Sequence, residues 1–137
     1  MGRWFRKISL CFAAGSMGGL VNSLALWLFG LYGLNSILDV AIAPRLTPGW
    51  LYPRVVWGGI WGALFLLPLV KSRYLLRGLI VSLGPTLVQL GYIFPHIAHQ
   101  GMLGLKLGTL TPVLVMIVNA LWGMTAALWL RLVDRSV

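Results

Sequence analysis

Two histidines, His96 and His99, are the residues of this sequence whose type and spacing best suit cofactor binding. Residues three positions apart lie on one face of a helix, so the spacing predicts that both imidazoles point the same way. A closed metal site needs further ligands, and few acidic residues lie nearby. A haem or a chlorophyll needs only one axial imidazole, so pigment binding remains an alternative. We prefer hydrogen bonding in a polar loop, and we expect no cofactor.

The residue types that perform catalysis are scarce in this chain. Asp39 and Asp134 are the only acidic residues, and Cys11 is the only cysteine. The sequence contains no nucleophile–base pair, no phosphate-binding loop and no cysteine cluster. We therefore expect no enzymatic activity. Neither acid falls in the middle of an apolar run, where ion-coupled transporters usually place a carboxylate, and this counts against that class.

Three uncharged amides, Asn22, Gln89 and Asn119, lie inside long apolar runs. An amide is unfavourable in hydrocarbon unless it is paired, so such residues usually face protein rather than lipid. The simpler interpretation is that these side chains form hydrogen bonds between neighbouring helices. The alternative is that they line a polar path or bind a ligand.

The elements that position these side chains are predicted to be membrane helices. Mean hydropathy is +0.90, and only 9% of residues are charged, which is too apolar for a soluble domain of this size. Each of four runs is long enough to cross a bilayer core of about 30 Å. We therefore predict an all-α polytopic membrane protein, a single domain over residues 1–137 that forms a four-helix bundle. The predicted spans cover residues 8–32, 54–70, 74–94 and 112–130.

The segments between these spans contain signals of their own. In the first outer segment, residues 35–53, the pair Ser36 and Asp39 predicts a capping box for a short interfacial helix after the first span. The second outer segment, residues 95–111, is too short and polar to cross the membrane. Within the third span, Pro85 is expected to interrupt the helix.

The cations of the sequence are distributed unequally between the two sides of the predicted bundle. Cytoplasmic segments of membrane proteins carry an excess of lysine and arginine, so both termini are predicted to be cytoplasmic. The location that fits is a bacterial inner membrane or a thylakoid-type membrane. The net charge of +9 indicates contact with anionic lipids rather than with nucleic acid. Eight cations lie on the predicted inner side (Arg3, Arg6, Lys7, Lys71, Arg73, Arg77, Arg131, Arg135), and three lie outside (Arg45, Arg54, Lys106).

Every predicted span carries two small residues four positions apart. In lipid, helices associate where small side chains let their backbones approach. A pair in each span predicts a tight bundle, or a bundle that also packs against copies of itself or other membrane proteins. The four pairs are Gly15 with Gly19, Gly58 with Gly62, Gly78 with Ser82, and Gly123 with Ala127.

Two functions fit these features. We prefer a non-catalytic small subunit or assembly factor of a larger membrane complex, because the chain is short, lacks a catalytic constellation and has small-residue pairs on every span. The alternative is a small homo-oligomeric channel or transporter for a small solute, which the three amides and Pro85 favour. The chain is too short to enclose a pore easily, so a channel would need several copies.

Overall fold

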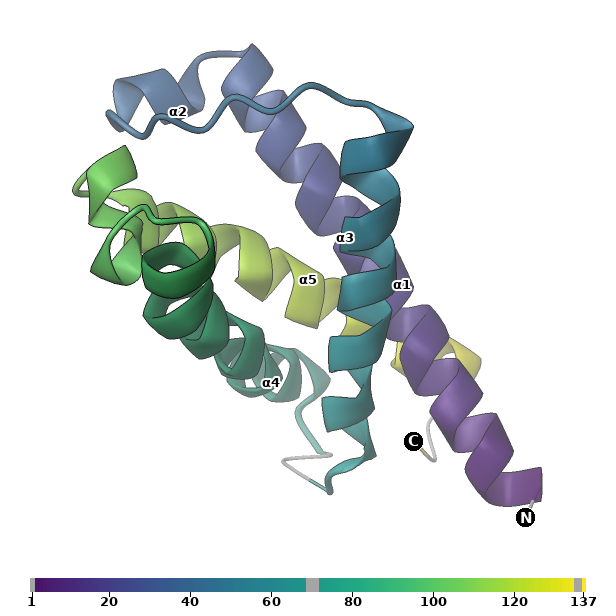
Figure 1. Ribbon diagram of the computed structural model, residues 1–137. Helices are drawn as coiled ribbons and strands as arrows, with labels where there is room; N and C mark the ends of the chain where they lie inside the picture. The colour runs from purple at the N-terminus through teal and green to yellow at the C-terminus, as the bar shows by residue number, and fades with distance from the viewer. Residues whose placement is uncertain (1, 69–71, 135–136) are drawn as a thin grey trace.

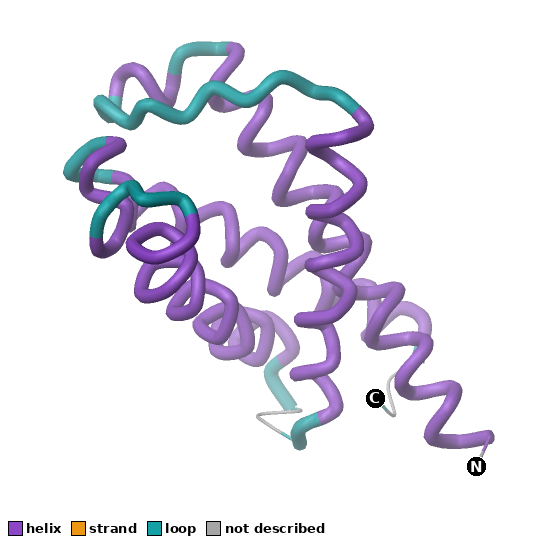
Figure 2. The backbone as a smooth tube through the Cα atoms, viewed as in Figure 1, coloured by secondary structure: helices purple, strands orange, loops and turns teal. Residues whose placement is uncertain are grey.

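The computed structural model describes residues 2–68, 72–134 and 137, and all of its regular elements are helices (Figures 1 and 2). The expected end of the second span at Val70 lies outside the described residues, as do the cations Lys71 and Arg135. Both chain termini lie at one end of the bundle (Figure 1). We call this the terminal end, and the opposite end the distal end.

Three helices are long and apolar enough to cross a membrane. The first is α1, Gly2–Leu31, which begins six residues before the expected span. The second is α4, Tyr74–Val88, continued by η2, Gln89–Ile97. The third is α5, Thr111–Val133. The chain is therefore an all-helical protein with three candidate membrane-spanning helices.

The expected second span has different bounds and is not one continuous α-helix. The helix α3 covers Pro48–Trp61, and the 3-10 helix η1 follows over Gly62–Leu66. Its start was predicted wrongly at Arg54. The Thr47 side chain accepts a hydrogen bond from the backbone N–H of Trp50 at 3.2 Å, and this cap starts the helix at Pro48, six residues earlier. With 14 residues, α3 alone is shorter than a bilayer crossing needs.

The helices pack in the spatial order α3, α1, α5, α4. Both α3 and η1 pack along α1, α1 packs on α5, and α5 packs on α4. Figure 1 shows α3–η1 and α4 close together near the terminal end and apart towards the distal end.

Of the two segments at the distal end, the first differs from expectation. Only a single turn, α2, Leu34–Ile37, forms in the first of them, and it begins before Ser36. The predicted capping box is wrong, because Gly33 precedes the turn in a left-handed conformation and Asp39 lies beyond it with φ 56°. In the second, η3, Met102–Leu107, contains left-handed residues and is a folded loop. The two segments meet where Ala41 donates a backbone hydrogen bond to Leu107 at 2.8 Å.

The expected break at Pro85 does not occur, because α4 continues through this residue to Val88. Hydroxyl groups supply local hydrogen bonds on either side. The Thr86 hydroxyl donates to the backbone oxygen of Ser82 at 2.7 Å, and the Ser82 hydroxyl donates to that of Leu79 at 2.6 Å. The helix changes its pitch later, where η2 adopts wider π-helical turns from Gln89 onwards. Such turns are frequent near functional sites.

Candidate binding site

The predicted small-residue pairs meet one another inside the bundle. At the α1–α3 crossing, a Cβ atom added to Gly19 would lie 2.9 Å from the backbone oxygen of Arg54, and one added to Gly58 would lie 2.7 Å from that of Gly15. A Cβ atom on Gly62 would collide with the backbone of Cys11. These distances are far below ordinary contact, so the two backbones touch directly along this crossing.

A second crossing of the same kind joins α4 and α5. A Cβ atom added to Gly78 would lie 2.5 Å from the backbone oxygen of Gly123, and one added to Gly123 would lie 3.1 Å from the Cβ of Ser82. Ala127 is buried one turn further along α5. The small residues of all four pairs therefore contact other helices of the same chain.

The three amides Asn22, Gln89 and Asn119 come together in one hydrogen-bonded network. The Asn22 amide nitrogen donates to Asn119 Oδ1 and to the backbone oxygen of Val118, each at 2.9 Å. The Asn119 nitrogen donates to Thr86 Oγ1 at 3.0 Å and to Gln89 Oε1 at 3.4 Å. The network links α1, α5 and α4–η2, and the side chains of Asn22 and Asn119 are only 7% and 6% exposed.

Arg54 extends this network to α3. Its Nε donates to Ser23 Oγ at 2.9 Å, and its Nη2 donates to Asn22 Oδ1 at 2.7 Å. The guanidinium also lies over the Trp50 ring, 4.8 Å from the ring centroid. The sequence interpretation placed Arg54 outside the membrane as a loop cation. The signal that could have placed it here is Thr47-Pro48, which starts the helix upstream of Arg54.

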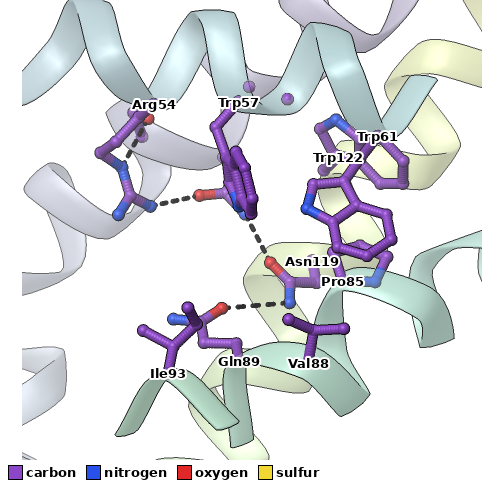
Figure 3. Close-up of a pocket in the computed structure, with 13 residues that line it drawn as sticks. Arg54, Trp57, Trp61, Pro85, Val88, Gln89, Ile93, Asn119 and Trp122 are labelled. Carbon is purple, nitrogen blue, oxygen red and sulfur yellow. Dashed lines mark hydrogen bonds between the residues drawn. The ribbon is translucent and has the colours of Figure 1, made fainter. Parts of the chain in front are cut away.

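A cavity of about 200 Å³ lies against this network. Figure 3 shows its two walls, with Arg54 and Trp57 extending from α3 towards Gln89 and Ile93 on α4–η2. Arg54 is the one charged side chain among the thirteen residues that line it. The back of the cavity is formed by α1 and α5, through Gly19, Asn22, Ser23, Asn119 and Trp122.

Two donors at this cavity have no protein acceptor in the described part of the chain. Arg54 donates hydrogen bonds through Nε and Nη2, and its Nη1 donates to no acceptor in the described part of the chain. Trp61 also lines the cavity, and its buried Nε1 has no acceptor among the described residues. A buried donor without an acceptor is unfavourable. The arrangement is therefore suited to a ligand that supplies oxygen acceptors.

The two histidines lie apart from this network, at the distal end. His96 is the second-last residue of η2, and its ring lies 5.5 Å from that of Tyr92. His99 follows the end of η2 with φ 55°. The prediction that they share a helical face is wrong, because η2 ends at Ile97, between them. No group of three or more His, Cys, Asp or Glu residues that could hold a metal ion occurs among the described residues.

No protein family, curated protein or solved structure that was compared matches this chain. Its class follows from its fold and its site. It is an all-helical chain with three candidate membrane-spanning helices, and an arginine and three amides line a cavity between two of its helices.

Proposed function

We propose that this chain is a non-catalytic integral membrane protein of the channel and transporter class, which holds a ligand in the cavity between α3 and α4–η2. The observation that carries the proposal is the Arg54–Asn22–Asn119–Gln89 network facing that cavity. Polar and charged residues at membrane depth usually serve a substrate or a pathway. The cavity lies within one chain, so this function needs no ring of copies.

A four-span topology is part of the proposal, with α3 and η1 together as the fourth span. An α-helix of 14 residues rises about 21 Å, and five residues of 3-10 helix add about 10 Å. Their sum is close to the hydrocarbon thickness of a bilayer. The common position of the two termini in Figure 1 supports an even number of crossings. The turn α2 then lies at the outer interface.

In the orientation that we propose, both termini lie in the cytoplasm if the membrane is a bacterial inner membrane. They lie in the stroma if it is a thylakoid-type membrane. Exposed cations at the terminal end favour this orientation, namely Arg3, Arg6, Arg73 and Arg131. Aromatic rings accompany the cations there. The Arg131 guanidinium lies 4.5 Å from the centroid of Tyr74, and the Lys7 ammonium lies 5.7 Å from that of Trp4. Such pairs are suited to the headgroup region, where anionic lipids gather.

Thiol labelling tests the topology. We expect Ser36→Cys, in a Cys11→Ser background, to react with an impermeant thiol reagent added to intact cells. Ser72→Cys, in the loop between η1 and α4, is expected to react only after permeabilisation, because α3–η1 returns the chain to the inner side. Both serines are exposed, and Cys11→Ser alone measures background labelling. Reaction of both positions from outside would show that α3–η1 does not cross.

A second candidate function is that of a subunit or assembly factor in a larger membrane complex. The observation that favours it is an apolar face of α4–η2 that contains a small residue. Leu87 is 69% exposed there, and a Cβ atom added to the exposed Gly91 one turn later would meet nothing within 4 Å. The other small-residue pairs of the sequence no longer support it, because they contact one another inside the chain.

Native mass spectrometry separates the two functions. After gentle extraction from its own membrane, the protein is expected to carry a non-covalently bound small molecule, and Arg54→Met is expected to lose it. Arg45→Met is the matched control, because Arg45 is an exposed cation in the segment before α3. A complex with other protein chains that contains no bound small molecule would contradict the proposal and support the subunit function.

A further inference from the structure

We infer that the ligand of this cavity is an anionic amphiphile from the outer leaflet, whose phosphate or carboxylate group binds Arg54 while its apolar chains extend into the bilayer. This inference rests on the proposed function, and it adds the chemical class of the ligand and the direction from which it enters. Four features of the cavity carry it, namely its charge, its free donors, its size and its depth.

The charge of the cavity calls for an anion. Arg54 is held by neutral acceptors, Ser23 Oγ and Asn22 Oδ1, and no acidic residue lines the cavity. A cation without a counter-ion is unfavourable within a membrane. An anionic group bound in the cavity would neutralise the positive charge of Arg54, which no acidic side chain of the cavity lining does.

The free donors are suited to an oxyanion. The hydrogen bonds to Ser23 and Asn22 fix the guanidinium through Nε and Nη2. Figure 3 shows the guanidinium extending away from α3 into the space in front of α4–η2. Arginine binds phosphate and carboxylate oxygens with strong, directed hydrogen bonds. The Nη1 donors of Arg54 remain for such oxygens.

The size of the cavity admits a headgroup but not a whole lipid. Its volume of about 200 Å³ is below the range of about 300–1,000 Å³ in which proteins enclose drug-sized molecules. The rest of the ligand must therefore lie outside. The apolar side chains at the rim, Trp57, Val88 and Ile93, belong to the two walls, and Trp57 is 51% exposed. An acyl chain can leave the cavity along them.

The depth of the cavity matches a headgroup of one leaflet. Arg54 follows the start of α3 by six residues, and Asn119 follows the start of α5 by eight, which places them about 9 Å and 12 Å from the distal helix ends. Trp50, which lies under the guanidinium, is of a residue type that prefers the headgroup level. With the proposed orientation, this level belongs to the outer leaflet.

Three probes test the class of ligand by their effect on the thermal unfolding of the purified protein in neutral detergent. Dioctanoyl phosphatidic acid carries both the anion and the chains, dioctanoylglycerol carries only the chains, and glycerol phosphate carries only the anion. We expect a concentration-dependent rise in the unfolding temperature with phosphatidic acid alone. Arg54→Met is expected to weaken its binding by about tenfold to a hundredfold, the worth of a charge-assisted hydrogen bond.

Two further variants keep the test independent of folding defects. Trp57→Leu changes a half-exposed side chain at the rim, and it is expected to weaken the binding of phosphatidic acid. Arg45→Met removes a cation remote from the cavity lining, and it is expected to leave binding unchanged. Equal stabilisation by glycerol phosphate, or by dioctanoylglycerol, would overturn the inference. The proposed function would survive either result, and it would fail only if the natively extracted protein carries no small molecule at all.

Discussion

Gly58→Leu is expected to separate α1 from α3 and to abolish the compact fold in detergent. Any side chain at this position would lie 2.7 Å from the backbone oxygen of Gly15 and 2.9 Å from the Cα of Gly19. Both atoms belong to the helix backbone and cannot rotate away as the end of a side chain can. The two helices must therefore move apart. We expect a loss of stability of at least about 3 kcal/mol, the upper part of the range for overpacking. The measurement is the thermal unfolding midpoint of the purified protein.

The control for this variant is Gly91→Leu, which makes the same chemical change at an exposed position. A Cβ atom at Gly91 meets nothing within 4 Å, so this variant is expected to unfold at the same temperature as the natural protein. Equal stability of the two variants would mean that α1 and α3 do not cross at Gly58. Loss of a native complex in Gly91→Leu alone would instead support the subunit function.

The hydropathy of the sequence was sufficient to predict an all-helical chain and three of its long helices. It was not sufficient for α3. The sequence predicts the second span from Arg54 and counts this residue among the outer cations. In the structure, Asn22 and Ser23 on α1 accept its hydrogen bonds, so the helix includes it. Such partners come from a distant part of the chain, and local hydropathy does not contain them.

The candidate site could be predicted only in part for a related reason. The amides Asn22, Gln89 and Asn119 stood out because each is costly alone in an apolar run. Which of them would be neighbours depends on the order α3, α1, α5, α4, which is a tertiary property. The cavity also depends on that order, because it forms where α3 and α4–η2 fail to close on each other. The prediction that His96 and His99 share a face was wrong because it required one helix to contain both residues. In the structure, η2 ends between them.

Arg77, at the terminal end, is a second arginine whose partners could not be predicted from local sequence. The sequence interpretation counted it among the inner cations, but its side chain is only 6% exposed. It donates to the backbone oxygens of Phe65, Leu67 and Val137, with 2.9 Å to that of Val137, and it lies over the Phe65 ring. The carbonyl groups at the end of η1 have no helical partners. Arg77 therefore joins the end of the α3–η1 segment to α4 and to the chain end.

Arg77→Met is consequently expected to lower the free energy of unfolding by about 2–4 kcal/mol, since it leaves three backbone oxygens without their charged donor. Arg77→Lys keeps the charge but cannot reach all three oxygens, so an intermediate loss is expected. The matched control is Arg73→Met, at the exposed N-cap position that precedes the same helix. Chemical unfolding in mild detergent measures all three variants. If Arg77→Met were as stable as Arg73→Met, Arg77 would be an interfacial cation in contact with lipid headgroups, and the end of η1 would be held by packing alone.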